Sequence, residues 1–470
     1  MSRPAKNTKH KLRPLLSLLF ASLGLCPPRR HHLADTPSSS SSSRSLLSVS
    51  YAVVIKMPME IGENDGSVEM LKNIHISSYE DDNDDDADRE EVEDLMNDDD
   101  DNENDEVQKP VTLGFVEKPK NKWSLLRQLF PSKAGGVPAW LDPNDLPSGR
   151  SRLCDMCGEP LQFLLQVYAP TSDRESTFHR ALYLFTCPSM PCLLRDQHEQ
   201  WKQPAVNASR SVKVFRCQLP RDNPFYSTEP PRHDGSDKPL GSGAPLCKWC
   251  GTWKGDKVCG SCREARYCSE KHQAMHWRSG HKVTCQNSST NAGNSSAEDQ
   301  KPASRSLWPE YEIVNEDEAE YDVNVPADLD NTDCLVSRNQ MDDSINSLVD
   351  CFQGDSDRRS WGNFQERIAR APEQVLRYCR NVGARPLWPM SSGQPSTADI
   401  PNCSYCGKPR CFELQVLPQL LYFLGVENNA DSLDWATIVV YSCEASCDGA
   451  AGYKEEFAWV QVSSPSQVVP

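Results

Sequence analysis

The sequence predicts an α+β chain that is predominantly β, in which two related sheet-rich half-domains flank a small module rich in cysteine and histidine. Two observations support this fold class. A pattern of a cysteine turn, a strand, and a second strand ending on a cysteine pair occurs on both sides of the module. Polar, low-complexity segments separate these blocks and contain too few apolar residues to form a core. We therefore expect three folded blocks joined by disordered segments.

Composition places the boundaries of these blocks. Helical patterns are sparse, and the best candidates are residues 122–130, 195–203 and 366–378. The expected segments are a disordered or targeting extension at 1–56, a disordered segment at 57–110 with an acidic run at 80–106, an N-terminal half-domain at 111–226, the cysteine and histidine module at 246–286, a flexible acidic and polar linker at 287–350, and a C-terminal half-domain at 351–465.

The net charge of −17 comes from one short segment. The chain has 50 Lys and Arg against 67 Asp and Glu, and residues 80–106 contain 18 of the acids with a single arginine. The remaining 49 basic and 49 acidic residues balance. Neither a strongly basic nucleic-acid-binding domain nor a uniformly acidic surface follows from the total. The acidic run itself is either a solubilising tail or an electrostatic attractor for a basic partner.

The first 56 residues allow three interpretations. They hold nine Lys and Arg, one acid and a leucine-rich run at 15–25 that is too short to span a bilayer. This outline fits a secretory signal, an organelle transit peptide, or a dispensable extension ahead of a working start at Met57.

The same pattern occurs in both predicted half-domains. It consists of a C-x-x-C-G-x-P turn, a strand, an insertion and a second strand that ends on a cysteine pair. Apolar and β-branched residues favour the strands, and Gly and Pro favour the turn that presents both thiolates. The turns lie at 154–160 and 403–409, and the strands at 161–168, 181–187, 412–417 and 436–443.

Twenty cysteines require an explanation in disulfides or metal. Two thiolates on one tight turn reach the same tetrahedral ion, so the close pairs favour zinc in a reducing cytosol or nucleus. The outer pairs form two candidate all-cysteine zinc sites: Cys154, Cys157, Cys187 and Cys192, and Cys403, Cys406, Cys443 and Cys447. The alternative, reduced cysteines buried at strand ends, stays open. We expect plain thiols at Cys26, Cys217, Cys334, Cys351, Cys379 and Cys411.

The central module has eight potential zinc ligands within 39 residues. In interleaved zinc modules alternate pairs share an ion, and this crossing fastens a segment too small to build a core. The expected sets are Cys247, Cys250, Cys268 and His272 for one zinc, and Cys259, Cys262, His281 and Cys285 for the other. His276 lacks the spacing and is expected to be exposed. Because protein side chains fill every position, we expect structural rather than catalytic zinc.

This module resembles the MYND zinc finger. Tyr267, Gln273, Trp277 and the closing His-x-x-x-Cys fall where that family has them, whereas His272 stands where cysteine is more common. The resemblance implies a protein-interaction module that binds proline-containing peptides. Direct nucleic acid binding is the weaker interpretation, since surface lysines are commonplace on small zinc modules.

The rest of the chain resembles the programmed cell death protein 2 family, which has two half-domains around a MYND finger. The motifs that carry the resemblance include L-G-F at 113–115, F-P-S-K-x-G-G-x-P-A-W-L at 130–141, V-F-R-x-Q-L-P at 214–220, P-L-W at 386–388 and Y-K-E-E-F at 453–457. The resemblance implies a non-enzymatic adaptor of cytoplasm and nucleus. It further implies that the adaptor escorts a newly made small-subunit ribosomal protein in ribosome biogenesis.

Two other functions are weighed against this escort. The first is a transcriptional corepressor, or a regulator of cell death or proliferation, that acts through the finger. The second is a lysine methyltransferase of the SET type, but its Asn-His-Ser-Cys-like motif and glycine-rich segment are missing from the sequence. No nucleophile elbow, phosphate loop or metalloprotease motif occurs either. The expected partners are therefore proteins, with no membrane.

Overall fold

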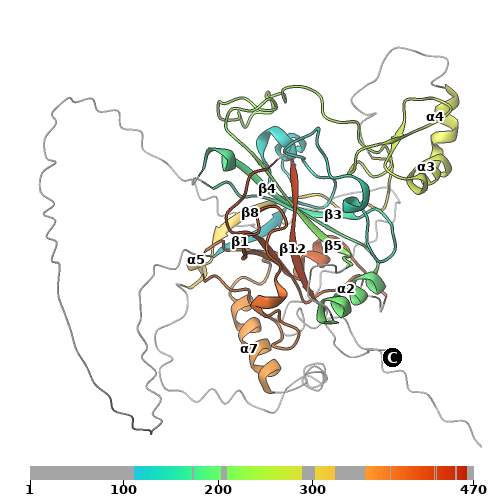
Figure 1. The fold of residues 1–470 in the computed structure, drawn as a ribbon. Helices are drawn as coiled ribbons and strands as arrows, with labels where there is room; N and C mark the ends of the chain where they lie inside the picture. The colour runs from blue at the N-terminus through green and yellow to red at the C-terminus, as the bar shows by residue number, and fades with distance from the viewer. Residues whose placement is uncertain are drawn as a thin grey trace, which may run out of the picture. The chain divides into compact units, whose positions relative to one another are not determined.

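Strands from both halves of the chain close into a single barrel in the computed structural model of the protein (Figure 1). The strand order is β1-β8-β2-β3-β4-β5-β12-β11-β10-β9. The bounds are β1 Thr112–Glu117, β2 Lys133–Ala134, β3 Gln162–Tyr168, β4 His179–Thr186, β5 Val212–Leu219, β8 Tyr311–Asp317, β9 Leu376–Tyr378, β10 Arg410–Val416, β11 Thr437–Cys443 and β12 Tyr453–Gln461.

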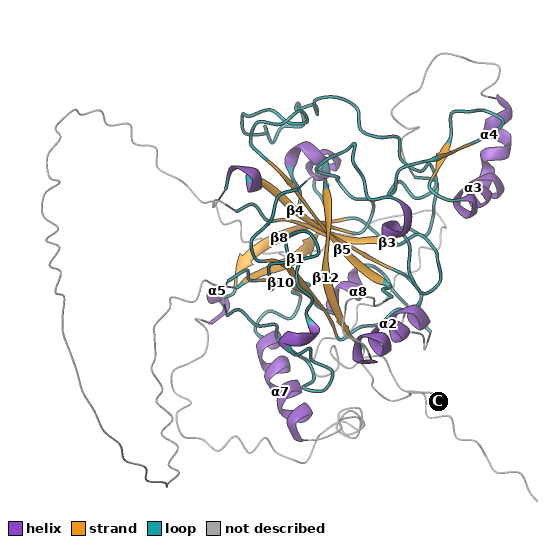
Figure 2. Cartoon of the chain, viewed as in Figure 1, coloured by secondary structure: helices purple, strands orange, loops and turns teal. Residues whose placement is uncertain are grey.

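The structure describes residues 111–171, 174–202, 209–287, 302–322, 355–381, 383–427, 429, 431–449 and 452–462. The predicted extension at 1–56 and the segment at 57–110, with its acidic run, lie outside the described residues. The predominantly β fold class is confirmed, as Figure 2 shows.

The two predicted half-domains share this barrel. Strands β3, β4 and β5 come from the first and β10, β11 and β12 from the second. The strands predicted beside the cysteine turns are β3, β4, β10 and β11, whereas β5 and β12 were not predicted as strands. The halves meet where β5 pairs with β12 and where β1 pairs with β9, both antiparallel. Neither repeat therefore closes its sheet without the other.

Apolar side chains cover both faces of the barrel wall. Successive strand residues point to opposite faces, so Leu182 and Leu184 of β4 lie in the interior cluster while Tyr183 and Phe185 lie in an aromatic cluster outside it. A further aromatic cluster, which includes Trp459 of β12, covers the C-terminal strands. Burial on both faces explains why these strands show nearly continuous apolar runs.

The assignment of residues 287–350 to a flexible linker is wrong for β8. This strand lies between β1 and β2, and the Ile313 N–H donates to Ser132 O at 2.9 Å. Only Ile313 is fully buried among its seven residues, and four of the others are acidic or asparagine. Such a strand has a weak hydrophobic pattern, so its partners rather than its composition fix it in the sheet.

The helix predictions are partly wrong. Residues 122–130 form two 3-10 turns, η1 Lys122–Leu125 and η2 Arg127–Leu129, in place of an α-helix. The helix predicted at 366–378 is α7, Asp355–Ala369, and its predicted C-terminal part is strand β9. Pro372 accounts for the early end, because proline disfavours helical geometry in the residue before it.

The other helices agree better with prediction. The segment predicted at 195–203 belongs to α2, Met190–Lys202, and α8, Gln419–Phe423, follows β10. Short elements complete the described fold: η3 Gly149–Arg152, η4 Glu175–Thr177, α5 Ala319–Asp322 and η8 Thr397–Asp399. Among the described residues, no helix has the length and apolar character to cross a membrane.

Ion pairs lie inside the barrel wall next to the apolar interior. Arg180 of β4 forms a bidentate pair with Glu413 of β10, and both side chains are fully buried. Arg216 of β5 and Arg410 of β10 pair with Glu456 of β12 at 2.7 and 2.9 Å. Burial would raise the pKa of Glu413, but the charges of Arg180 and Arg380 and a hydrogen bond from Ser442 lower it to about 2.

Candidate metal centres

Tight turns and one capped helix build the finger. Strand β6, Lys257–Val258, pairs with β7, Arg266–Tyr267, and helix α3, Glu270–His276, follows. The backbone N–H of Gly251 donates to Cys247 O at 2.7 Å, which closes the first turn around its two thiols. Ser269 caps α3 by accepting from His272 N at 3.1 Å, so the cap also places the histidine. After Gly280, α4, Lys282–Asn287, carries the last cysteine.

The structure brings together the two interleaved sets that the spacing predicts. One group is Cys247, Cys250, Cys268 and His272, and the other is Cys259, Cys262, His281 and Cys285. Within each group the potential ligand atoms lie within 4.8 Å of one another. The crossed order along the chain is therefore matched by two separate clusters in space.

The distances in these groups fit zinc. A tetrahedral ion with Zn–S bonds of about 2.3 Å places its sulfur ligands about 3.8 Å apart. The Sγ atoms of Cys250 and Cys268 lie 3.8 Å apart. Those of Cys259 and Cys285 are also 3.8 Å apart, and Cys262 Sγ lies 3.6 Å from His281 Nε2. Cys268 Sγ and His272 Nδ1 lie closer, at 3.1 Å, so this one pair would separate slightly around a tetrahedral ion.

His276 is not a member of either group. Its Nδ1 lies 3.0 Å from the Tyr267 hydroxyl, and its ring stacks on that of His281 with the centroids 4.7 Å apart. The side chain is half-buried, so the expectation that it is exposed is wrong. Its contact with His281 places it beside a potential ligand.

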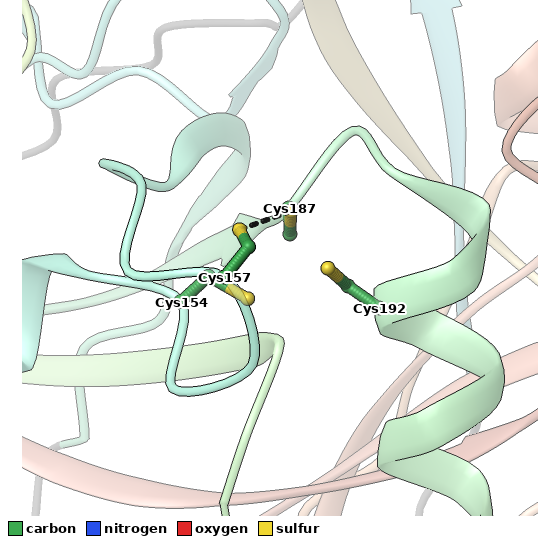
Figure 3. A group of neighbouring side chains, drawn as sticks. All are labelled: Cys154, Cys157, Cys187 and Cys192. Carbon is green, nitrogen blue, oxygen red and sulfur yellow. Dashed lines mark hydrogen bonds between the residues drawn. The ribbon is translucent and has the colours of Figure 1, made fainter. Parts of the chain in front are cut away.

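The outer cysteines also converge as the sequence predicts. Figure 3 shows Cys154, Cys157, Cys187 and Cys192 facing one another from the C-x-x-C turn, the end of β4 and the start of α2. The Sγ atoms of Cys157 and Cys187 lie 3.7 Å apart. The second outer group is Cys403, Cys406, Cys443 and Cys447.

The second outer group has similar geometry. Its Sγ atoms lie 3.7 Å apart between Cys403 and Cys447 and 3.5 Å apart between Cys406 and Cys443. In each outer group three cysteines are buried, and the second cysteine of the C-x-x-C turn, Cys157 or Cys406, is exposed. The thiols of Cys217, Cys379 and Cys411 stand outside all four groups, whereas Cys26, Cys334 and Cys351 lie outside the described residues.

Close packing makes neighbouring thiols share protons, so the pKa of one thiol falls while that of its partner rises. A hydrogen bond from Cys187 outweighs burial and lowers the pKa of Cys154 to about 5, while the same shared proton raises the pKa of Cys187. In the finger, hydrogen bonds from Cys250 and Cys268 lower the pKa of Cys247. A divalent cation would replace the shared protons and be held by thiolates.

Trp253 joins the finger to the barrel, a contact that the sequence analysis missed. Its side chain is completely buried, and its Nε1 donates to Leu161 O at 2.8 Å. Its ring packs against Phe185 of β4 with the centroids 4.5 Å apart. Trp140 makes the reciprocal bond, from its Nε1 to Thr252 O at 2.8 Å. The signal available in the sequence was a large apolar residue, Trp253, between the first two cysteine pairs and outside the ligand pattern.

Replacing Trp253 by phenylalanine is expected to lower the free energy of unfolding by about 1–2 kcal/mol, because Leu161 O loses its buried donor. Urea unfolding followed by circular dichroism measures this change. The matched control is W277F, since Trp277 is 37% exposed and is expected to change little. Equal effects of the two substitutions would contradict the role assigned to Trp253.

Comparisons with known proteins agree with this architecture. Family models of the programmed cell death protein 2 N-terminal domain, the MYND finger and the programmed cell death protein 2 C-terminal domain match residues 110–233, 247–285 and 358–462. Programmed cell death protein 2 from Bos taurus is 39% identical over 75% of this chain and 96% of its own length. The Rattus norvegicus protein of that name is 39% identical over 75% of this chain and 97% of its own.

A shorter match joins the chain to a yeast protein. "Probable 20S rRNA accumulation protein 4" from Schizosaccharomyces pombe is 30% identical over 21% of this chain and 27% of its own length. No solved structure matches the chain. The domain matches and the high coverage of the mammalian relatives together show that the chain belongs to the programmed cell death protein 2 family.

Proposed function

We propose that the protein is a zinc-binding adaptor that escorts a newly made small-subunit ribosomal protein in cytoplasm and nucleus. The observation that carries the proposal is the similarity to a relative whose name refers to 20S rRNA accumulation. The chain belongs to the programmed cell death protein 2 family, and its MYND finger supports a role in protein interaction. An adaptor of this kind works by binding.

The four metal groups support binding rather than catalysis. We assign the four residues of each group as the ligands of one structural zinc ion. Four protein ligands complete a tetrahedral zinc and leave no position for substrate. The chain's own residues then hold the turns, the finger and the barrel ends in fixed positions.

The finger also offers apolar side chains to a partner. Val283 on α4 is 64% exposed, and Trp277 and Val258 are 37% and 39% exposed. Apolar side chains on a rigid zinc module suit docking of a proline-containing peptide. This exposure is the specific observation that favours the second candidate function, a corepressor that acts through the finger.

Affinity capture of newly made protein tests the proposal. The full chain is tagged, pulse-labelled partners are recovered, and mass spectrometry identifies them. We expect one dominant small-subunit ribosomal protein. Recovery of corepressors alone, or of no enriched ribosomal protein, contradicts the escort.

A variant of the finger surface separates the two candidates. Val283→Ser removes an exposed apolar side chain that belongs to neither ligand group. If the barrel binds the client, capture of the ribosomal protein is unchanged in this variant. Loss of that capture in V283S would instead assign client binding to the finger.

A further inference from the structure

The two outer cysteine groups have a feature in common beyond their ligands. We call β3, β4 and β5 the first repeat and β10, β11 and β12 the second. Each cysteine group lies at the end of the middle strand of one repeat. The segment that follows this strand contacts the last strand of the other repeat. In the first repeat that segment is α2, whose first turn contains Cys192. Gln200 of α2 exchanges two hydrogen bonds of 2.9 Å with the backbone of Val460, and Val462 N donates to Gln197 Oε1 at 2.6 Å.

The second repeat makes the reciprocal contact. Its segment is the turn at 443–447, and the strand it holds is β5 of the first repeat. Arg216 Nη1 and Nη2 donate to Cys447 O at 3.3 and 3.4 Å, and Nη2 also lies 3.6 Å from Cys447 Sγ. Gln218 Nε2 donates to Ser446 O at 3.2 Å and lies 3.3 Å from an oxygen of Asp448.

These contacts reinforce one of the two junctions between the halves, the pairing of β5 with β12. The register of β5 with β12 runs only from Tyr453 opposite Cys217 to Glu456 opposite Val214. The pairing of β4 with β5 inside the first repeat runs the whole length of both strands. Helix α2 and the turn at 443–447 add side-chain hydrogen bonds on either side of this short ladder.

Charge supports a metal at the second group. Four thiolates around one zinc ion carry a net charge of −2. The ion-paired cluster beside it contains four arginines, Arg180, Arg216, Arg380 and Arg410, against two glutamates, Glu413 and Glu456. Arg216 is 1% exposed, so its charge has little access to water. Arg216 and Arg380 of this cluster donate to the backbone of the cysteine turn, at Cys447 O and Cys443 O, so their charges lie beside the thiolates.

We propose that the two outer groups are tetrathiolate zinc sites that act as reciprocal clasps, each fastening the last strand of the other repeat. Arg216 is the positioning residue of the second site. Its guanidinium donates to the coordinating turn and offsets the negative charge of the site. The metal therefore couples the two halves of the barrel, a role separate from peptide binding by the finger.

The first test counts zinc and compares two arginine variants in the full chain. Wild type is expected to bind four zinc ions, by elemental analysis after gel filtration. Arg216→Met leaves every ligand in place and is expected to weaken one zinc by about tenfold in chelator competition, as loss of a group that orients a ligand does. Arg216→Lys keeps the charge and should recover most of that affinity. Arg221→Met is the control, because Arg221 bonds to Thr228 O and contacts Phe178 away from the cysteines.

Differential alkylation identifies the site that weakens. Peptide mass spectrometry after treatment with N-ethylmaleimide and chelator reads each cysteine set separately. We expect faster labelling of Cys403 and its partners in R216M, with the finger cysteines unchanged. A wild-type count of two zinc ions, equal labelling in R216M and wild type, or failure of R216K to recover would overturn the proposal.

Hydrogen exchange tests the clasp itself. Cys406→Ser removes an exposed ligand of the second site, and Cys411→Ser, a thiol on the same β10 hairpin outside the group, is the control. Loss of the second zinc is expected to speed amide exchange in β5, in the opposite repeat. Faster exchange confined to β10 and β11 would show that the site serves its own repeat alone and would overturn the reciprocal role.

Discussion

Replacing Cys259 by serine is expected to unfold most of the finger while the barrel stays folded. Structural zinc contributes about 10–16 kcal/mol in zinc-finger peptides, and a segment of this size has little other source of folding energy. Cys259 belongs to the group that ties the second turn to α4. Elemental analysis should show the loss of at least one zinc ion per chain, and hydrogen exchange should show unprotected amides in α3 and α4.

The control for this prediction is Cys411→Ser, which removes a half-buried thiol outside the four groups. That variant should keep the zinc content and the exchange pattern of the wild type. Strands β10 and β11 serve as the internal reference, since they pair with each other and their apolar residues pack in clusters other than that of the finger cysteines. Unchanged zinc content in C259S, or equal deprotection of barrel and finger, would contradict the prediction.

The cysteine groups could be predicted from the sequence because their ligands come in close pairs. Two thiolates on one tight turn reach the same ion, so spacing limits the possible ligand sets even before the fold is known. The structure brings together the same residues, from Cys154 in the first group to Cys447 in the last. The repeated strands beside them were predicted for the same reason, since each follows a recognisable turn.

The closure of the barrel could not be predicted in this way. Strand β8 has a weak apolar pattern, and three-residue β9 follows a helix and a proline. Both owe their conformation to pairing with β1, which is distant in sequence from each of them. The buried arginines and glutamates were missed as well, because a charged residue in a strand ordinarily predicts the solvent face.

Replacing Glu413 by glutamine is expected to lower the free energy of unfolding by about 3–5 kcal/mol, since it removes one partner of a buried ion pair. The Arg180 side chain is 0% exposed, and its guanidinium is always protonated. Glutamine keeps the shape of the side chain but leaves this charge without its carboxylate. Urea unfolding at neutral pH, with zinc present, measures the loss.

Two further variants distinguish a buried charge from a lost contact. R180M/E413L replaces both partners by apolar groups and should recover much of the loss. A double variant less stable than E413Q would contradict this account, as would an E413Q protein within about 1 kcal/mol of wild type.

The single variant Arg180→Met should be less harmful than E413Q, because the two ions respond differently to isolation. Arginine cannot lose its proton, whereas burial raises the pKa of a carboxyl group left without its guanidinium, so Glu413 can become neutral. A raised folded-state pKa means that the folded protein binds more protons than the unfolded chain. The stability of R180M should then rise as the pH falls from about 8 to about 6, while that of E413Q, which lacks the titrating group, should not. Parallel pH profiles for R180M and E413Q would show that Glu413 stays charged without Arg180, and that Arg380, whose Nε lies 3.6 Å away, is sufficient to hold it.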